Sequence, residues 1–316
     1  MTQGSDTLSR EYVSPEHYAE FLERLGHRVR RVNDLYWFNT QRGVYTAFPF
    51  HRSISCSQVS RAEILQRDGV LLRYGCPQGE GVASFRMLCA DPDYDFPALR
   101  SRTRTQVRRG LESCQVEQID FDLLQRAGLQ LNVDTLIRQG RSVPSDLERY
   151  WRRFYEAAQQ TPGAEAWGAF VDGNLAAYLI SFAIEDVANM TIVRSATAHL
   201  GCYPNNALVF RFLQERLRSG KVRCVSYGYQ SVQSGTDSLD QFKSGMGFIR
   251  DAVDQRIEIA AWARPFLNRL TLPAVARLLG LAGNPEQTAK LRGIADWYRQ
   301  QPTPAEILAR REKAAA

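Results

Sequence analysis

The clearest alternation of apolar and polar positions lies in the second half of the chain. Two apolar runs, Trp167–Val171 and Leu175–Ile184, flank Asp172-Gly173-Asn174, whose residue types tolerate a positive φ. This pattern predicts a β-hairpin. Glu185-Asp186 then predicts a second turn, and the apolar run Ala188–Ser195 predicts a third strand.

A loop, a helix and further strands are predicted next. After a loop at His199–Asn205, apolar residues recur at helical spacing over Asn206–Arg218, which predicts an amphipathic helix. A strand over Val222–Tyr229, a short helix around Leu239–Ser244 and a closing strand over Ala252–Ile259 follow. Because strand–helix–strand crossovers are right-handed and join parallel strands, we expect Val222–Tyr229 to run parallel to the strand before the helix.

The rest of the chain shows weaker patterns. Residues 1–28 contain a short helical lead-in, and residues 30–96 alternate short β-prone runs with turns. Residues 97–160 are predicted to be mainly helical. From Pro265 onward the pattern predicts helices with breaks, and we expect Arg310–Ala316 to be frayed.

Composition indicates a globular protein. Of the 316 residues, 44% are hydrophobic and 23% are charged, values that exclude wholesale disorder. Because no run of about eighteen apolar residues is present, we expect no membrane span. Met1–Arg10 lacks the apolar segment of a signal peptide, so we expect a cytoplasmic protein. The formal net charge of +6 favours an anionic partner, such as a phosphate-bearing cofactor or RNA.

Cysteines and histidines do not form a metal-binding pattern. The six cysteines include no C-x-x-C pair, and the four histidines stand apart in the sequence. We therefore expect no metal site and no disulfide framework. Most thiols are expected to be small buried groups, and a single cysteine nucleophile stays open as an alternative.

Several segments carry a resemblance to a known family. They are the Trp167–Ile184 hairpin, Tyr203–Leu208 at the start of the predicted helix, and Leu239–Phe248, which looks like an F-K-x-x-x-G-F/A element. With the order of the elements, these segments resemble the GNAT superfamily of acyltransferases, and more closely its FemAB-like and BioF2-like acetyltransferase branch. The arginine-rich stretch Leu99–Gly110 is similar to a segment at the join between the halves of such proteins.

The resemblance implies a mixed α/β fold of the α+β type. Its core is a GNAT-like mixed central sheet flanked by helices, in one copy or in two tandem halves, followed by a helical C-terminal extension. The implied domains are a helical lead-in over 1–28, an N-terminal GNAT-like or accessory half over 29–160, an acyltransferase domain over 161–261, and the extension over 262–316.

The segment before the predicted helix departs from the standard family pattern. Most GNAT members have a Q/R-x-x-G-x-G/A pyrophosphate loop there, whereas His199–Asn206 contains one glycine. A helix N-terminus still binds phosphate through its N–H groups and dipole, so Tyr203, Asn205 and Asn206 are candidate ligands of an acyl-CoA or acetyl-CoA co-substrate. In the alternative interpretation the helix is an ordinary one, capped by Asn205. The resemblance adds Lys243 as a phosphate ligand, the alternative being a lysine that points to solvent.

Five arginines without an acidic neighbour fall within ten residues: Arg100, Arg102, Arg104, Arg108 and Arg109. On a helix, three of them share one face, where like charges repel. An anion such as the CoA 3′-phosphate, a carboxylated substrate or tRNA phosphates would offset this repulsion, and Arg104 and Arg108 are the candidates for that contact. Alternatively, the arginines form a solvated face paired with Asp91, Asp93 or Asp95.

Catalytic candidates lie beyond the ends of the predicted strands, where ligands gather in α/β sheets. Alternation places Tyr227 and Tyr229 on one face, where a hydroxyl either protonates a leaving thiolate or belongs to a ring that only packs in the core. Asp237, nearby, is a carboxylate able to accept a proton from an ammonium. The resemblance places Ser195 and His199 at the height where acyl groups bind in GNAT folds, although an isolated histidine is more often structural.

These features lead to one main functional hypothesis and two alternatives. The main hypothesis is an N-acyltransferase in which a small-molecule or peptide amine directly attacks an acyl group activated as a CoA thioester. The first alternative is an aminoacyl-tRNA-dependent amino-acid or peptidyl transferase of FemAB type. The second is a non-catalytic binding protein that has kept the GNAT fold and lost the cofactor loop.

Overall fold

The chain divides into two units, each assembled from stretches that are far apart in the sequence. In the computed structural model, which describes residues 12–231, 237–267, 271 and 285–315, unit 1 comprises 1–26, 87–228 and 239–249, and unit 2 comprises 27–86, 229–238 and 250–316. The boundary that the sequence predicts between residues 160 and 161 lies inside the stretch 87–228 of unit 1. The predicted C-terminal extension, 262–316, is grouped with unit 2.

Unit 1 is built on a mixed sheet. Its strands are β6 (Gln115–Ile119), β7 (Ala164–Val171), β8 (Asn174–Ile184), β9 (Val187–Ser195) and β10 (Cys224–Tyr229), in the spatial order β10-β9-β8-β7-β6. Neighbouring strands from β6 to β9 are antiparallel. The predicted hairpin is confirmed, with positive φ at Asp172 and Gly173. The predicted parallel crossover is confirmed as well, since β10 runs parallel to β9.

The prediction that residues 97–160 are mainly helical is confirmed by helices over Ser101–Ser113, Phe121–Arg138 and Leu147–Gln159, but it did not include strand β6. This strand pairs antiparallel with β7 at the edge of the unit 1 sheet. Only Val116 and Ile119 in this strand are apolar, so the alternation that marks a half-buried strand is weak. Pairing with β7, rather than local pattern, determines this strand.

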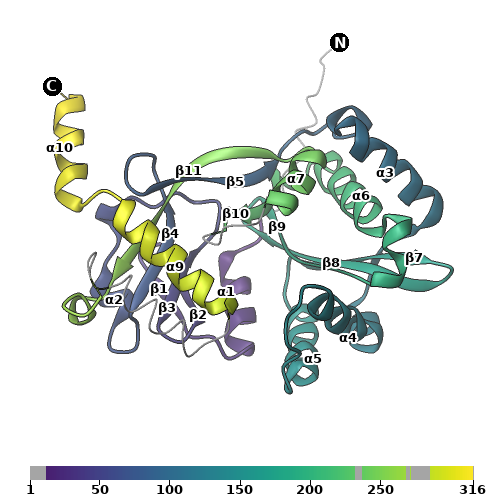
Figure 1. Cartoon of the computed structure of the whole chain (residues 1–316), viewed down its shortest axis with the longest axis horizontal. Helices are drawn as coiled ribbons and strands as arrows, with labels where there is room; N and C mark the ends of the chain where they lie inside the picture. The colour runs from purple at the N-terminus through teal and green to yellow at the C-terminus, as the bar shows by residue number, and fades with distance from the viewer. Residues whose placement is uncertain (1–11, 232–236, 268–270, 272–284, 316) are drawn as a thin grey trace, which may run out of the picture. The chain divides into compact units, whose positions relative to one another are not determined.

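Helices cover both faces of the unit 1 sheet (Figure 1). α3 (Ser101–Ser113) and α6 (Pro204–Arg218) lie on one face, and α4 (Phe121–Arg138) and α5 (Leu147–Gln159) lie on the other. α1 (Pro15–Arg24) packs against α5 and β8 through Phe21, whose ring centroid is 4.5 Å from that of Phe182. The predicted helical lead-in is thus part of the unit 1 core.

α3 is held between α6 and α7 (Asp237–Gly245) by two glycines. A Cβ atom at Gly110 would lie 2.8 Å from the carbonyl oxygen of Tyr203 and 3.1 Å from Cβ of Ala207. A Cβ atom at Gly245 would lie 2.5 Å from Oγ1 of Thr103. Only glycine allows such close approach, so these two positions fix how near the helices come to one another.

The alanine variant of Gly110 tests this packing. Gly110→Ala forces α3 away from α6, and overpacking of this kind costs about 1–3 kcal/mol, offset by up to about 1 kcal/mol of helix propensity. We expect urea unfolding to show a net loss of stability. Gly201→Ala is the matched control, because a Cβ atom there meets nothing within 4 Å. Equal unfolding midpoints for the two variants would contradict the packing argument.

Unit 2 has its own mixed sheet and core. Its strands β1 (Val29–Val32), β2 (Leu35–Gln41), β3 (Val44–Phe48), β4 (Leu71–Cys76) and β11 (Ile249–Ile259) lie in that order. The β3–β4 pair is parallel and the other pairs are antiparallel. Trp37, Tyr45 and Leu72 are fully buried in the core, together with Ile64 of α2 (Arg61–Leu65). β5 (Val82–Cys89) runs from the residues of unit 2 into those of unit 1.

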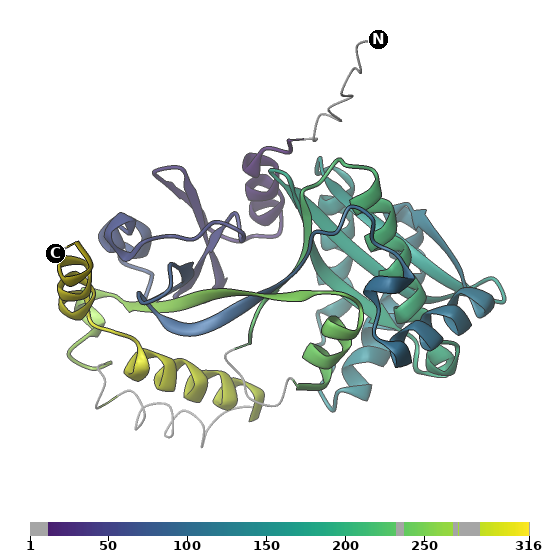
Figure 2. The ribbon, with the colours of Figure 1, turned by 90° about the horizontal axis from the view of Figure 1, so that it is seen from above.

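The C-terminal helices α9 (Pro285–Gln300) and α10 (Pro304–Ala315) are part of unit 2. α9 lies alongside β11 (Figure 2), and the Gln301 amide bonds both backbone groups of Ile257, accepting from the N–H at 2.9 Å and donating to the C=O at 2.7 Å. Arg311 of α10 pairs with Glu80 and the helix continues to Ala315, which corrects the expected fraying for residues 310–315; Ala316 lies outside the described residues. The correction depends on a partner more than two hundred residues away, which the local sequence does not indicate.

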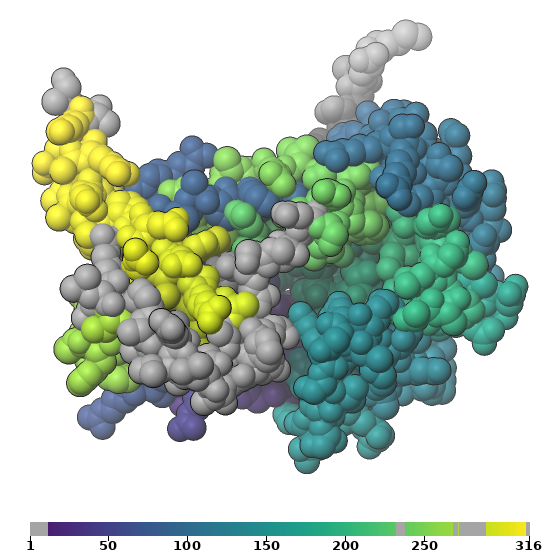
Figure 3. Space-filling view, in the orientation of Figure 1, coloured from purple at the N-terminus to yellow at the C-terminus, as the bar shows by residue number. Residues whose placement is uncertain are grey.

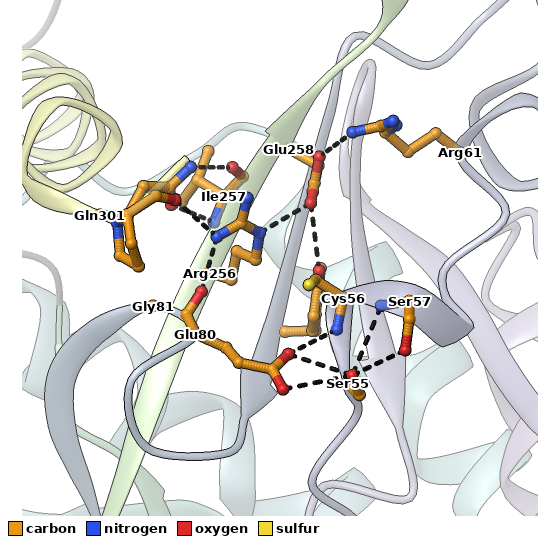
Figure 4. A network of polar contacts seen from close by, with 12 residues as sticks. Ser55, Cys56, Ser57, Arg61, Glu80, Gly81, Arg256, Ile257, Glu258 and Gln301 are labelled. Carbon is orange, nitrogen blue, oxygen red and sulfur yellow. Dashed lines mark hydrogen bonds and ion pairs between the residues drawn. The ribbon is translucent and has the colours of Figure 1, made fainter. Parts of the chain in front are cut away.

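A buried ionic network lies beside this attachment (Figure 4). Arg256, 2% exposed, pairs with Glu258 at 2.7 Å and donates to the carbonyl oxygens of Glu80 at 2.6 Å and Pro302 at 3.0 Å. Glu258 also accepts from Arg61 at 2.6 Å. Since these bonds satisfy the charge of Arg256, the network joins β11 to the connection between α9 and α10 without an unpaired buried charge.

Gln301→Ala tests whether the extension stabilises unit 2. The substitution leaves the N–H and C=O of Ile257 unsatisfied, and each buried unsatisfied group costs about 1–3 kcal/mol. We expect a clear fall in the unfolding midpoint in urea, whereas Gln300→Ala, at an exposed neighbouring position, should have little effect. If both variants unfold at the wild-type midpoint, the extension is not part of the cooperative unit.

Candidate active site

The candidate site of unit 1 lies where β9 and β10 diverge. The two strands pair at three positions: Val187 with Cys224, Ala188 with Val225, and Asn189 with Ser226. Beyond Asn189, β9 continues to pair with β8 as far as Ser195, whereas its pairing with β10 ends. The β9 edge from residue 190 to 195 is therefore open on the side of β10, in a segment that β8 holds in place.

Ser195 lies at the wide end of this divergence and joins three elements. It is 1% exposed, and its Oγ accepts from Asn205 Nδ2 at 3.0 Å and from Arg138 at 3.2 Å. Its carbonyl oxygen accepts from Arg138 at 2.9 Å. Ser195 thus connects β9, α4 and the first turn of α6, and its hydroxyl serves as an acceptor rather than as an exposed nucleophile.

The start of α6 differs from the prediction. The helix begins at Pro204, and its N-cap is Tyr203, which has a φ of 54° and makes no side-chain capping bond. Asn205 therefore lies in the first turn and is not the cap. Its Oδ1 is buried and has no hydrogen-bond partner among the described residues. Pro204 has no N–H, and the N–H groups of Asn206 and Ala207 donate to the Tyr203 carbonyl at 3.1 and 3.2 Å. The unsatisfied acceptor of Asn205 offers a place for an N–H donor.

Asn206 and His199, also predicted near the site, have different surroundings. Asn206 is buried, and its Nδ2 contacts Gln106 Oε1 at 3.5 Å and Met246 Sδ at 4.0 Å, so it faces α3. His199 is half-buried in a 3₁₀ turn, Thr197–Cys202, directly after β9. Of these two, only His199 lies in the segment between β9 and α6.

Tyr227 lies on β10 just past the last β9–β10 pair. Its ring packs edge-on against Phe248 at 5.5 Å, and Lys243 Nζ lies 4.8 Å from its centroid. Burial raises the pKa of Tyr227 to about 12, partly opposed by the positive charge of Arg194. Lys243 is 6% exposed and lies 3.6 Å from Asp240; burial lowers its pKa, and Asp240 partly offsets this. The lysine therefore points to a carboxylate and a ring, not to solvent.

Tyr229 does not share a face with Tyr227, which corrects the prediction. Gly228 between them has a φ of 86°, so the alternation of a regular strand is broken. Tyr229 belongs to unit 2, where its hydroxyl donates to the Phe50 carbonyl at 2.6 Å and covers Gly75 so closely that a Cβ atom would overlap it. The candidate Asp237 follows β10 and begins α7, and its side chain lies outside the described residues.

Two of the arginines of α3, Arg104 and Arg108, contact the segment that precedes the helix. Arg104 donates to the carbonyl oxygens of Phe96 at 3.1 Å and Leu99 at 3.2 Å, and Arg108 lies 5.4 Å above the Phe96 ring. Asp95, a predicted partner, pairs with Arg218 at 2.5 Å instead. α3 lies at the surface (Figure 3), and none of its arginines forms an ion pair with a described residue.

The sequence did not identify a cavity of about 300 Å³ in unit 1. It lies between α4, α5 and the end of β9, and Arg194, Trp151 and Leu136 are among the residues that line it. Helical spacing marks Trp151 as a core residue, and Arg194 is an isolated cation in a strand. The feature of the sequence that could have indicated this cavity is therefore Arg194, a charged residue in a strand of mostly apolar residues, directly before Ser195.

Other classes of site receive no support from the described residues. Within them, no group of three or more His, Cys, Asp or Glu side chains is placed to hold a metal ion. Burial raises the pKa of Cys89 to about 12 and that of Cys114 to about 11, which keeps both thiols protonated at neutral pH. No described helix is both long and apolar enough to cross a membrane.

The raised pKa of Tyr227 predicts a pH dependence of stability. A tyrosine in an unfolded chain titrates near pH 10, so the protonated, buried hydroxyl contributes stability that is present below about pH 10 and is lost as pH rises through about 12. We expect the difference in urea midpoint between wild type and Tyr227→Phe to be constant up to about pH 10 and to change above it. A phenolate absorbance that titrates near pH 10 and is missing only from the variant would refute the assignment.

The comparisons with known proteins concern the fold. No protein-family model and no curated protein sequence matches the chain. Among solved structures, FemX is similar over 81% of this chain and 93% of its own, with a TM-score of 0.57 and 11% identity. The C-terminal domain of a protein assigned as a lysylphosphatidylglycerol synthetase, from Agrobacterium fabrum, is similar over 79% of this chain and 89% of its own, with a TM-score of 0.51 and 11% identity. The predicted fold is confirmed: the chain has a GNAT-like fold of the FemAB type.

Proposed function

We propose that unit 1 is an N-acyltransferase that transfers an acyl group from an acyl-CoA to an amine by direct attack. The observation that carries the proposal is the divergence of β9 and β10 after three pairs, directly before the uncapped start of α6. An open strand edge supplies backbone N–H groups that are fixed before the ligand arrives, and such groups stabilise the negative charge that develops on an acyl oxygen.

The start of α6 supports binding of the donor. The positive end of its dipole favours phosphate, although the N–H groups of Asn206 and Ala207 already donate to the Tyr203 carbonyl and no glycine-rich loop precedes the helix. The unsatisfied Oδ1 of Asn205 fits an amide N–H, a group that the pantetheine arm of CoA carries. Tyr203 and Asn205 are therefore the donor-binding residues of the proposal, and Asn206 and Lys243 support the surrounding packing.

The proposed reaction needs a base and an acid. The ammonium form of the amine first loses a proton, and its nitrogen then attacks the acyl carbon while the carbon–sulfur bond breaks and the thiolate takes up a proton. His199 is the candidate base. Tyr227 is the candidate acid, because it lies just past the last β9–β10 pair and its hydroxyl is protonated at neutral pH. Ser195 positions Asn205, and positioning of the two reactants supplies much of the rate enhancement.

A second candidate function is an aminoacyl-tRNA-dependent transferase. The exposed arginines of α3, which form no ion pair with the described residues, favour it, because a row of unpaired arginines binds a phosphate backbone in a salt-dependent way. An Arg102→Gln/Arg109→Gln variant should then lose RNA affinity and show a weaker salt dependence. Binding of acyl-CoA should not change in that variant.

A thermal-shift screen tests the main proposal. Acetyl-, medium-chain and long-chain acyl-CoAs are compared with free CoA and with charged tRNA; a ligand at about one hundred times its Kd adds about 2.7 kcal/mol of stability and raises Tm by several degrees. We expect one acyl-CoA class to raise Tm, and intact-mass analysis to show acylation of an added amine. Asn205→Ala should abolish the shift, while Asn174→Ala, in the exposed hairpin turn, should keep it.

The other outcomes separate the alternatives. A shift and transfer activity that require charged tRNA and disappear with RNase would favour the second function. If calorimetry detects no binding of any CoA thioester or tRNA, the chain is a non-catalytic protein with this fold and the proposal is wrong.

A further inference from the structure

The cavity between α4, α5 and the end of β9 combines a cation with apolar walls. Arg194 contributes the cation, and Trp151, Tyr150, Leu136 and Leu147 contribute most of the wall in a space of about 300 Å³. This volume is at the lower end of the range for small-ligand sites. A cation in a pocket whose walls are mostly apolar is typical of a site that orients a ligand by an ionic contact.

Arg194 has no anionic partner in the protein as described. It is half-buried, its guanidinium lies 5.8 Å from the Trp151 ring, and it donates at 2.9 Å to the carbonyl oxygen of Val193. No carboxylate of the described residues lies within ion-pair distance of it. The carbonyl oxygen and the ring replace part of the hydration that the half-buried guanidinium loses, and a ligand carboxylate would replace more of it with bidentate hydrogen bonds.

The one carboxylate that lines the cavity is placed differently. Asp146 lies before the first turn of α5, its side chain is 61% exposed, and it is 4.0 Å from Arg149. The cavity therefore has a cation at β9 and an anion at its solvent-exposed part. This arrangement favours a ligand with one carboxylate at its inner end and disfavours a ligand that is anionic at both ends.

The walls of the cavity are fixed before a ligand binds. Asn132, 1% exposed, accepts from Tyr178 at 2.5 Å and donates to Tyr155 at 2.8 Å, and the two tyrosine hydroxyls are 3.0 Å apart. This closed triangle of hydrogen bonds joins α4, α5 and β8. Preorganisation of this kind lowers the entropy that binding costs.

The cavity is close to the diverging strands. Arg194 immediately precedes Ser195, the end of the open β9 edge, and its charge is near enough to Tyr227 to oppose the effect of burial on that hydroxyl. A small molecule held by its carboxylate at Arg194 therefore lies beside the end of the strand whose open edge forms the proposed acyl site.

We infer that this cavity binds the amine acceptor through the acceptor's carboxylate, and that the acceptor is an α-amino acid with an apolar side chain. Arg194 binds the carboxylate, and Trp151, Leu136 and Leu147 contact the side chain. The amine is then left for acylation. The role as acceptor rests on the proposed acyltransferase function, whereas carboxylate-dependent binding does not.

Calorimetry with matched ligands tests this inference. L-Phenylalanine and L-leucine are titrated into the full-length protein, with phenylalaninamide and 2-phenylethylamine as ligands that lack the carboxylate. Loss of a charge-assisted bidentate contact should weaken binding about tenfold or more. Arg194→Gln should weaken binding of the amino acids by a similar factor and leave binding of the amide unchanged. Arg152→Gln, on the exposed face of α5 and paired with Glu148, is the matched control and should bind as wild type.

Each outcome decides one question. The inference fails if the amide or the amine binds as well as the amino acid, if Arg194→Gln keeps full affinity, or if none of the ligands binds at millimolar concentration. The comparison of ligands on the wild-type protein does not depend on the variant folding. Carboxylate-dependent binding without acyl transfer from any donor would overturn the proposed function alone. Acylation of amines regardless of a carboxylate would overturn this inference alone.

Discussion

The three-residue parallel pairing of β9 with β10 is the constraint on which the rest of unit 1 depends. Because α6 connects these strands, its start must lie at the end of β9, and the parallel direction follows from the right-handed crossover. β8 pairs with β9 from Val187 to Ser195 with one register shift at Thr191, so β9 stays extended after β10 has separated from it. The open edge is thus a rigid part of the sheet and not a loose strand end. Its neighbours, Ser195 and Asn205, are hydrogen-bonded to each other, which ties the helix start to the same edge.

The position of α3 depends on the same helix start, because α3 packs closely against the N-cap of α6. Gly110 lets α3 approach the carbonyl of Tyr203, the N-cap of α6, and Gly245 lets α7 approach α3. Arg104 and Arg108 are occupied with the Phe96 segment that precedes α3, so they are not available in the way the sequence suggested. The remaining arginines are exposed on a helix that cannot turn without breaking two close contacts. A surface that is both charged and rigid suits a polyanionic partner better than a solvated, mobile face would.

The sequence predicted those parts of the fold whose signals are local. The hairpin turn at Asp172-Gly173 and the amphipathic pattern of α6 are examples, and the crossover followed from their order. It missed what distant contacts decide: β6 is a strand because β7 pairs with it, and α10 is attached to unit 2 because Arg311 meets Glu80. At the site, the prediction that Tyr227 and Tyr229 share a face assumed regular alternation, which the positive φ of Gly228 breaks. The candidate residues Ser195 and Asn205 do come together, but the cavity beside Arg194 depends on three elements that the sequence alone could not bring into contact.

Two cations lie near Tyr227, and the difference between them indicates where a ligand charge belongs. Lys243 is sealed from solvent and has Asp240 beside it, so its charge is already balanced and an added phosphate would have to displace a carboxylate. Arg194 is half-buried, lines a cavity and has no carboxylate of the described residues within ion-pair distance. Removing a charge from water without a partner is unfavourable, so a position of this kind persists only where something else compensates it. Since the Trp151 ring supplies only part of that compensation, a ligand anion is the partner that the geometry lacks.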